Sequence, residues 1–249
     1  MFFYLFRDEA SRPNLNPPRR RPLILATFTL SSQTLHISKS LNELVQAAIY
    51  THLPDAEHKG YGKENKNFKA MNFFAEQEKN QIKVKFSAFN KDYEATIAKA
   101  ILLDTFKIGA LHFARKTVEI CEKRIEENQA ILSGYVCVYI KDPQGKRLFL
   151  EPKDERFLKA LKNNALQKYE ALLGEPYQGE LDIQTLYQKK FPQFFLYGKA
   201  KNLSWYGKYE VKANPKMLNL LLDTGMGSKA MQGCGFVEEC GDEKNDDKK

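Results

Sequence analysis

Hydrophobic and polar residues alternate most cleanly in residues 81–89 (QIKVKFSAF). Ile82, Val84 and Phe86 would face one side of an extended chain there, and two lysines would face the other. This period of two predicts a half-buried β-strand. Two other segments repeat their apolar residues every three or four positions instead, which predicts amphipathic helices at 40–53 and 91–103.

Three further segments around these elements have the apolar character of strands: 23–30, 67–75 and 106–113. In chain order the elements are then strand, helix, strand, strand, helix and strand. This is the order of a ferredoxin-like unit. We therefore expect an N-terminal ferredoxin-like domain over residues 23–125.

A polar stretch, EKRIEEN at 122–128, separates this half of the chain from a second one. The second half predicts a strand at 131–140, a long helix from about Asp154, a hairpin over 194–212 that turns near Asn202, a helix at 215–222 and a strand at 235–240. We expect a second ferredoxin-like (RRM-like) domain over residues 126–240, so the predicted fold class is α+β with two tandem domains. The ends predict a basic Pro/Arg-rich arm at 1–22 and a charged, disordered tail at 241–249.

Composition narrows the functions that these two domains could carry. The 249 residues are 43% hydrophobic, enough for buried cores, and the net charge is +8. No stretch approaches the ~18 uninterrupted apolar residues of a membrane span, so we expect no membrane partner. The excess of positive charge favours a polyanion such as nucleic acid as the partner.

The four cysteines form no C-x-x-C pair, and the four histidines lie elsewhere in the chain. Zinc sites need ligands at short paired spacing, so we expect no metal site. The N-terminus does not begin as a signal peptide, which has basic residues before its apolar stretch. We therefore expect a cytoplasmic protein whose cysteines are small buried hydrophobes rather than disulfides.

Four of the 14 glycines fall within eleven residues, in the text DTGMGSKAMQGCGF: Gly225, Gly227, Gly233 and Gly235. Residues 225–230 match the dinucleotide-binding pattern G-x-G-x-x-G/A. That pattern needs a strand before it and a helix after it inside a βαβ unit. Here a helix-like segment precedes it, so we reject that interpretation.

Two interpretations of this glycine loop are left. Exposed backbone N–H groups, together with Ser228, Lys229 and Gln232, would suit a phosphate backbone. A tight turn that requires positive φ is the alternative.

Lysines and aromatic residues alternate upstream of the glycine loop, in residues 197–212. Aromatic side chains can stack on bases and lysines can contact phosphates. The predicted RNA contacts there are Lys199, Lys201, Tyr206 and Lys208. A hairpin with a half-buried aromatic face is the alternative.

The run G-x-G-x(5)-G-x-G-F before a terminal strand resembles the glycine-rich signature of the CRISPR-associated repeat RNA-processing endoribonucleases. These are the sixth of the numbered Cas proteins and belong to the RAMP superfamily. The text YGKAKNLSWYGKYEVKANPKMLNLLLDTGMGSK and the pair of ferredoxin-like halves are similar to that family too. The resemblance covers residues 23–240.

The resemblance implies an enzyme that cuts RNA without a metal or other cofactor. The ribose 2′-hydroxyl attacks the adjacent phosphate, which leaves a 2′,3′-cyclic phosphate and a 5′-hydroxyl. The implied partners are CRISPR repeat RNA and other Cas proteins of an interference complex, with the chain as a monomer or homodimer. A non-catalytic RAMP subunit that binds guide RNA as a scaffold is the alternative.

The resemblance also implies three catalytic residues. Three segments resemble the family's helix tyrosine, its histidine loop and the strand that follows: QAAIY (46–50), HKGY (58–61) and NFKAMNFF (67–74). The corresponding residues are Tyr50, His58 and Lys69. Lys63 and Lys66 are nearby substitutes for Lys69.

A histidine ordinarily titrates near pH ~6.5, so His58 would carry a proton as general base or acid. Tyr50 would be its partner or orient the substrate, and Lys69 would stabilise the charged phosphate. On a helical projection of 40–53, Tyr50 lies opposite the apolar stripe, where its hydroxyl could meet a substrate, and His52 lies inside the stripe as a core residue. The charged, glycine-containing segment around His58 predicts a loop.

Overall fold

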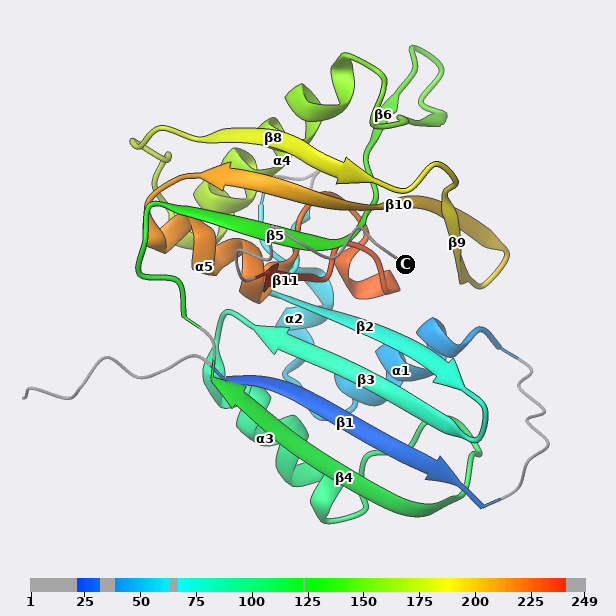
Figure 1. The fold of residues 1–249 in the computed structure, drawn as a ribbon. Coiled ribbons are helices and arrows are strands. Elements are labelled where there is room, and N and C mark those ends of the chain that lie inside the picture. Colours follow the sequence, from blue (N-terminus) through cyan, green and yellow to red (C-terminus); the bar gives the residue numbers. More distant parts are fainter. Residues whose placement is uncertain (1–21, 32–38, 63–66, 123, 241–249) are drawn as a thin grey trace, which may run out of the picture.

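Each half of the chain folds around an antiparallel sheet, and the two sheets share one strand order. The computed structural model describes residues 22–31, 39–62, 67–122 and 124–240. In Figure 1 the two domains are stacked, with both sheets toward the viewer and the helices behind them. This is the expected α+β class with two tandem ferredoxin-like domains.

The N-terminal sheet has the order β2-β3-β1-β4. Its domain consists of β1 (Pro22–Leu30), α1 (Leu41–Tyr50), α2 (Asp55–Lys59), β2 (Met71–Glu78), β3 (Gln81–Ala88), α3 (Lys91–Leu102) and β4 (Phe113–Glu122). The register places Ala26 beside Val84 and Phe28 beside Ile82, so the apolar faces of β1 and β3 coincide. Helices α1 and α3 cover that face, and each large apolar side chain buried there stabilises the domain by roughly 1.5–3 kcal/mol.

The C-terminal sheet has the same order when it is read as β8-β10-β5-β11. β9 pairs with the N-terminal end of β10. Its domain consists of β5 (Gln129–Val136), β6 (Tyr139–Lys141), β7 (Arg147–Phe149), α4 (Arg156–Leu173), β8 (Asp182–Gln188), β9 (Gln193–Tyr197), β10 (Ala200–Lys212), α5 (Pro215–Thr224), the 3₁₀ helix η1 (Ala230–Gln232) and β11 (Val237–Cys240). Tyr209 and Val211 of β10 pack against α4 and α5 in its core.

The strand predicted at 106–113 is wrong. Phe106 and Ile108 are fully buried, but they fill the core from a loop, and the strand is β4. β4 is an edge strand and carries many charged residues. Charged side chains on an edge strand prevent it from pairing with strands of other chains. The polar composition of β4 explains why its sequence did not predict a strand. The polar stretch between the domains begins where β4 ends.

Other element boundaries in the second half also differ from the prediction. The strand expected at 131–140 is two strands, β5 and β6, because the chain leaves the sheet after Val136. The hairpin turns at Gly198 and Lys199 rather than near Asn202, which is buried inside β10 and donates to Gln232 Oε1 (2.9 Å). β8 had no predicted counterpart, because its apolar residues do not alternate regularly.

The glycine loop, residues 225–235, is buried between the two domains. The N–H of Met226 donates to the carbonyl of Gly235 (2.8 Å), and that of Ser228 donates to the carbonyl of Cys137 (2.8 Å), just beyond β5. Met231 of η1 is 3% exposed and packs in the core of the N-terminal domain. The loop therefore belongs to the C-terminal domain by sequence but completes the core of the other.

Glycine is required where the two ends of this loop approach each other. Gly225 and Gly235 have φ values of 79° and 84°, a region that side chains disfavour. A Cβ at Gly235 would lie 2.4 Å from the carbonyl oxygen of Met226. Positive φ and close backbone approach thus account for the glycines, as the tight-turn interpretation predicts.

We expect Gly235→Ala to lower the free energy of unfolding by about 3 kcal/mol or more, because it adds a backbone clash to the strain of positive φ. Gly174→Ala is the matched control. Its φ is 76° but a Cβ there meets nothing within 4 Å, so the cost should be only about 1 kcal/mol. Urea unfolding followed by the fluorescence of Trp205 measures both, and equal losses would contradict the role assigned to the loop.

A buried polar cluster joins α3 to the end of α5, beside the start of the glycine loop. Glu94 and Asp223 are 1% and 2% exposed, and Lys91 Nζ lies 2.7 Å from a carboxylate oxygen of each. The hydroxyl of Ser87 donates to the same Glu94 oxygen (3.2 Å). Burial raises the pKa of Glu94 to about 7, against the opposing effect of Lys91.

The pKa of Glu94 predicts a dependence of stability on pH. A carboxyl group with a raised folded-state pKa binds its proton more tightly when folded, so its contribution is present below pH ~4.5 and is lost as the pH rises through about 7. Over that range the free energy of unfolding should fall by up to about 3 kcal/mol more in the wild type than in Glu94→Gln. Parallel curves for the two proteins would refute this, and Glu119→Gln on the exposed face of β4 serves as control.

Candidate active site

Helix α2 folds back against the end of α1 and brings His58 to Tyr50. Ser40 caps the start of α1 by accepting the N–H of Glu43 (3.3 Å), and the helix ends at Tyr50. The chain changes direction at Pro54, and α2 begins at the next residue. The rings of Tyr50 and His58 are 4.2 Å apart between centroids, and His58 Nε2 lies 3.4 Å from the carbonyl oxygen of Tyr50. His58 is therefore on a short helix rather than in the predicted loop, and it is exposed.

A β-bridge between Tyr61 and Phe68 brings Lys69 to the same place. The N–H of Tyr61 donates to the carbonyl of Phe68 (2.8 Å), and the reverse bond is 2.6 Å long. Lys69 Nζ then donates to the carbonyls of Glu57 (3.2 Å) and His58, and lies 5.8 Å from the centroid of the Tyr50 ring. Burial lowers the pKa of Lys69, and the negative charge of Glu57 opposes that shift. The structure thus brings Tyr50, His58 and Lys69 together.

The hydroxyl of Tyr50 is buried and has no hydrogen-bond partner among the described residues. This corrects the expectation that it faces a substrate, because α2 and the segment after it cover the side of α1 that the helical projection left open. Burial raises the pKa of Tyr50, and the nearby Glu57 raises it further. The ring packs against the N-terminal core, while His52 stacks on Phe106 as a half-buried residue.

Glu57 is a site residue that the sequence did not reveal. It is 2% exposed, and its carboxylate accepts hydrogen bonds from Tyr61 (2.6 Å) and Tyr93 (3.0 Å). The hydrogen bond to Glu57 is the main cause that raises the pKa of Tyr61 to about 12. Glu57 stands directly before His58, but no motif marks it, since its partners come from a bridge and from α3.

A cleft of about 790 Å³ lies between the domains and joins Lys69 to the glycine loop. Its walls come from α4, β6, β7, the glycine loop and the segment before β2. Five of the described residues that line it are cationic and none is acidic: Lys69, Lys141, Arg147, Lys168 and Lys229. A concave surface with charge of one sign attracts a polyanion.

The glycine loop reaches this cleft with Gly227, Ser228, Lys229 and Gln232. Lys229 Nζ and the guanidinium of Arg147 lie 5.8 and 5.5 Å from the ring centroid of Tyr139. Burial lowers the pKa of Lys229, and the charge of Arg147 lowers it further. Two cations therefore meet on one tyrosine in the cleft.

The expected row of exposed backbone N–H groups in the loop is not found. All four loop glycines are buried, and the N–H groups of Gly225 and Gly235 donate to the carbonyls of Leu221 (2.8 Å) and Tyr135 (2.6 Å). What the loop offers the cleft is mainly the side chain of Lys229.

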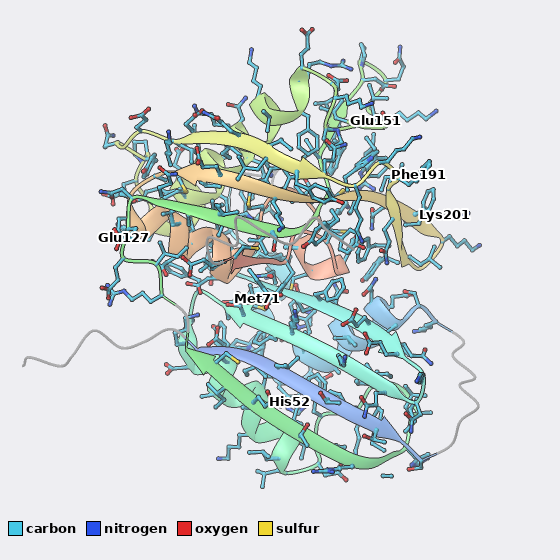
Figure 2. All side chains as sticks on the ribbon, in the orientation of Figure 1. His52, Met71, Glu127, Glu151, Phe191 and Lys201 are labelled. Atoms are coloured by element: carbon cyan, nitrogen blue, oxygen red, sulfur yellow. The ribbon has the colours of Figure 1, made fainter. Side chains whose placement is uncertain are left out.

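The lysines and the aromatic residue predicted to contact RNA from the hairpin do not line the cleft. Tyr206 and Lys208 alternate with the core residue Tyr209 on β10, so they are on the face of the sheet without helices. Lys199 and Lys201 are exposed at the tip of the β9–β10 hairpin, and Lys201 extends outward there (Figure 2). Lys63 and Lys66 lie outside the described residues.

Within the described ranges, no three His, Cys, Asp or Glu side chains gather where they could hold a metal ion. None of the helices there is long and apolar enough to cross a bilayer. The four cysteines are free: Cys137 and Cys234 are buried, and Cys121 and Cys240 are half-buried.

Residues 122–239 match the family model described as CRISPR associated protein Cas6, C-terminal. The C-terminal part of this chain is therefore similar to the Cas6 family. The resemblance expected from the glycine-rich signature is thereby confirmed. No curated protein matches the chain significantly.

Solved structures extend the Cas6 likeness to nearly the whole chain. The product of a Cas6-related gene from Pyrococcus furiosus is 18% identical, with a TM-score of 0.70 over 90% of this chain and 100% of that one. A RAMP protein that binds different RNA substrates is 17% identical (TM-score 0.70, 89% and 100% covered). A Cas6 product complex is 14% identical (TM-score 0.62, 88% and 100% covered). These likenesses confirm the pair of ferredoxin-like domains.

Proposed function

We propose that the protein is an endoribonuclease that cuts CRISPR repeat transcripts into guide RNAs without a metal ion. The observation that carries this proposal is the meeting of Tyr50, His58 and Lys69 beside a cleft lined by cations. The match of residues 122–239 to the Cas6 C-terminal family model supports the substrate. The known structures of a Cas6 product complex and of an RNA-binding RAMP protein support RNA as its chemical class.

The reaction needs a base for the ribose 2′-hydroxyl, an acid for the leaving 5′-oxygen and a cation for the charged phosphorane. His58 is the exposed proton carrier of the three, and its own backbone carbonyl accepts a hydrogen bond from Lys69 Nζ. Lys69 is the cation. The products are a 2′,3′-cyclic phosphate and a 5′-hydroxyl.

Tyr50 has a different role in the proposed reaction from the contact with substrate that the sequence suggests. With a buried hydroxyl and a raised pKa it keeps its proton at neutral pH. Its ring lies against the imidazole, and its carbonyl faces His58 Nε2. Tyr50 therefore orients His58 and does not exchange protons with the RNA.

A non-catalytic RAMP subunit that binds guide RNA as a scaffold is the second candidate. This candidate is favoured by the hydrogen bonds of Lys69 Nζ, which are made to two backbone carbonyls of the protein rather than left for a phosphate. A scaffold would use the same cleft for RNA but would need no proton carrier at His58.

In excess EDTA, the wild type should cut RNA carrying the repeat of its own genome, and His58→Ala should be slower by about 10² to 10⁴. His112→Ala, an exposed histidine at the start of β4, is the matched control and should keep the wild-type rate. Single-turnover cleavage followed on a denaturing gel measures all three.

Undiminished cutting by His58→Ala would refute the site, and RNA binding without cutting by the wild type would favour the scaffold. Replacing the 2′-hydroxyl next to the cut by hydrogen should abolish cleavage while binding persists. Cleavage of that substrate would refute attack by the 2′-hydroxyl.

A further inference from the structure

Lys168 is a buried lysine on α4 to which no role in the chemistry above is given. It is 2% exposed and lies at the edge of the cleft. Its Nζ donates to the carbonyls of Thr224 (3.1 Å) and Gly225. Burial lowers the pKa of Lys168 to about 7, so holding this side chain inside the protein is costly.

The two carbonyls that Lys168 holds are the end of α5 and the start of the glycine loop. Gly225 ends the helix with a φ of 79°, so the chain turns sharply there. The last carbonyls of a helix have no partner within it, and a cation at that end is favourable. Lys168 supplies hydrogen bonds to these carbonyls from a neighbouring helix.

The same junction is held from the other domain. Asp223, one residue earlier, lies 2.7 Å from Lys91 Nζ at the end of β3 and the start of α3. The junction of α5 and the loop, four residues before Lys229, is thus held on one side by the buried Lys168 and on the other by the half-buried Lys91. Beyond it the loop is next bonded at Met226 and Ser228.

We propose that Lys168 is a positioning residue, which fixes the start of the glycine loop and thereby the place of Lys229 in the cleft. The inference rests on the proposed function only for the statement that the cleft binds RNA. Both bonds of Lys168 go to backbone carbonyls, and its side chain is almost fully covered, so it acts through the loop rather than on the RNA.

Hydrogen exchange tests the first half of this inference without any RNA. In Lys168→Met the amides of residues 225–235 should exchange about tenfold faster, because the junction of α5 and the loop loses the two hydrogen bonds from Lys168. The amides of β1 and β3 should be unchanged, which shows that the fold is intact. Lys168→Arg keeps donors at this place and should restore most of the protection. Lys159→Met, on the exposed side of α4, should change nothing.

Binding of single-stranded oligouridylate tests the second half by a double-mutant comparison. We expect Lys229→Ala and Lys168→Met each to weaken binding, by up to about tenfold at low salt. The double variant should bind no more weakly than Lys229→Ala alone, because Lys168 acts through Lys229. In cleavage assays Lys168→Met should raise KM more than it lowers kcat.

The two proposals fail in different ways. Unchanged exchange in Lys168→Met would overturn the role of Lys168 alone. Losses that add in the double variant would show that Lys168 contacts RNA directly, which also overturns it. Failure of the wild type to bind RNA would overturn the proposed function together with the cleft half of this inference, whereas the exchange result would still decide whether Lys168 holds the loop.

Discussion

The arrangement of the two domains depends on a loop whose backbone approaches itself too closely for side chains. Gly225 and Gly235 meet at a separation that a Cβ would prevent, and both lie at positive φ. Because of this turn, Met231 reaches the N-terminal core from the C-terminal domain. One segment is therefore part of two cores, and the cleft between the domains has a fixed shape only while that loop keeps its conformation.

Charge in the cleft follows from the same loop. It carries Lys229 to Tyr139, where Arg147 of β7 already lies, and the two cations disfavour one another. Such an arrangement costs stability in the absence of an anion. Asp223 and Glu94, by contrast, are kept at the back of the loop and paired with Lys91. These two acidic groups are thus held away from the face that the cations line.

The fold could largely be predicted because its signal is local. The alternation in β3 and the helical spacing in α3 depend on one face of each element, and both are where the sequence places them. β4 could not be found in this way, because an edge strand needs charge more than it needs apolar alternation. The opposite error occurs at Phe106 and Ile108. These apolar residues predict a strand, but they lie in a loop and are buried in the core from there.

The sequence could suggest which residues form the candidate site but not how they are arranged, because that arrangement depends on tertiary contacts. A helical projection describes one helix and cannot show that α2 will cover its open side and bury the hydroxyl of Tyr50. Glu57 shows the same limit, since its hydrogen-bond partners are Tyr61 of the β-bridge and Tyr93 of α3, which lies 36 residues further along the chain. Burial keeps the hydroxyl of Tyr50 protonated, whereas the imidazole of His58, whose ring centroid lies 4.2 Å from that of Tyr50, is exposed.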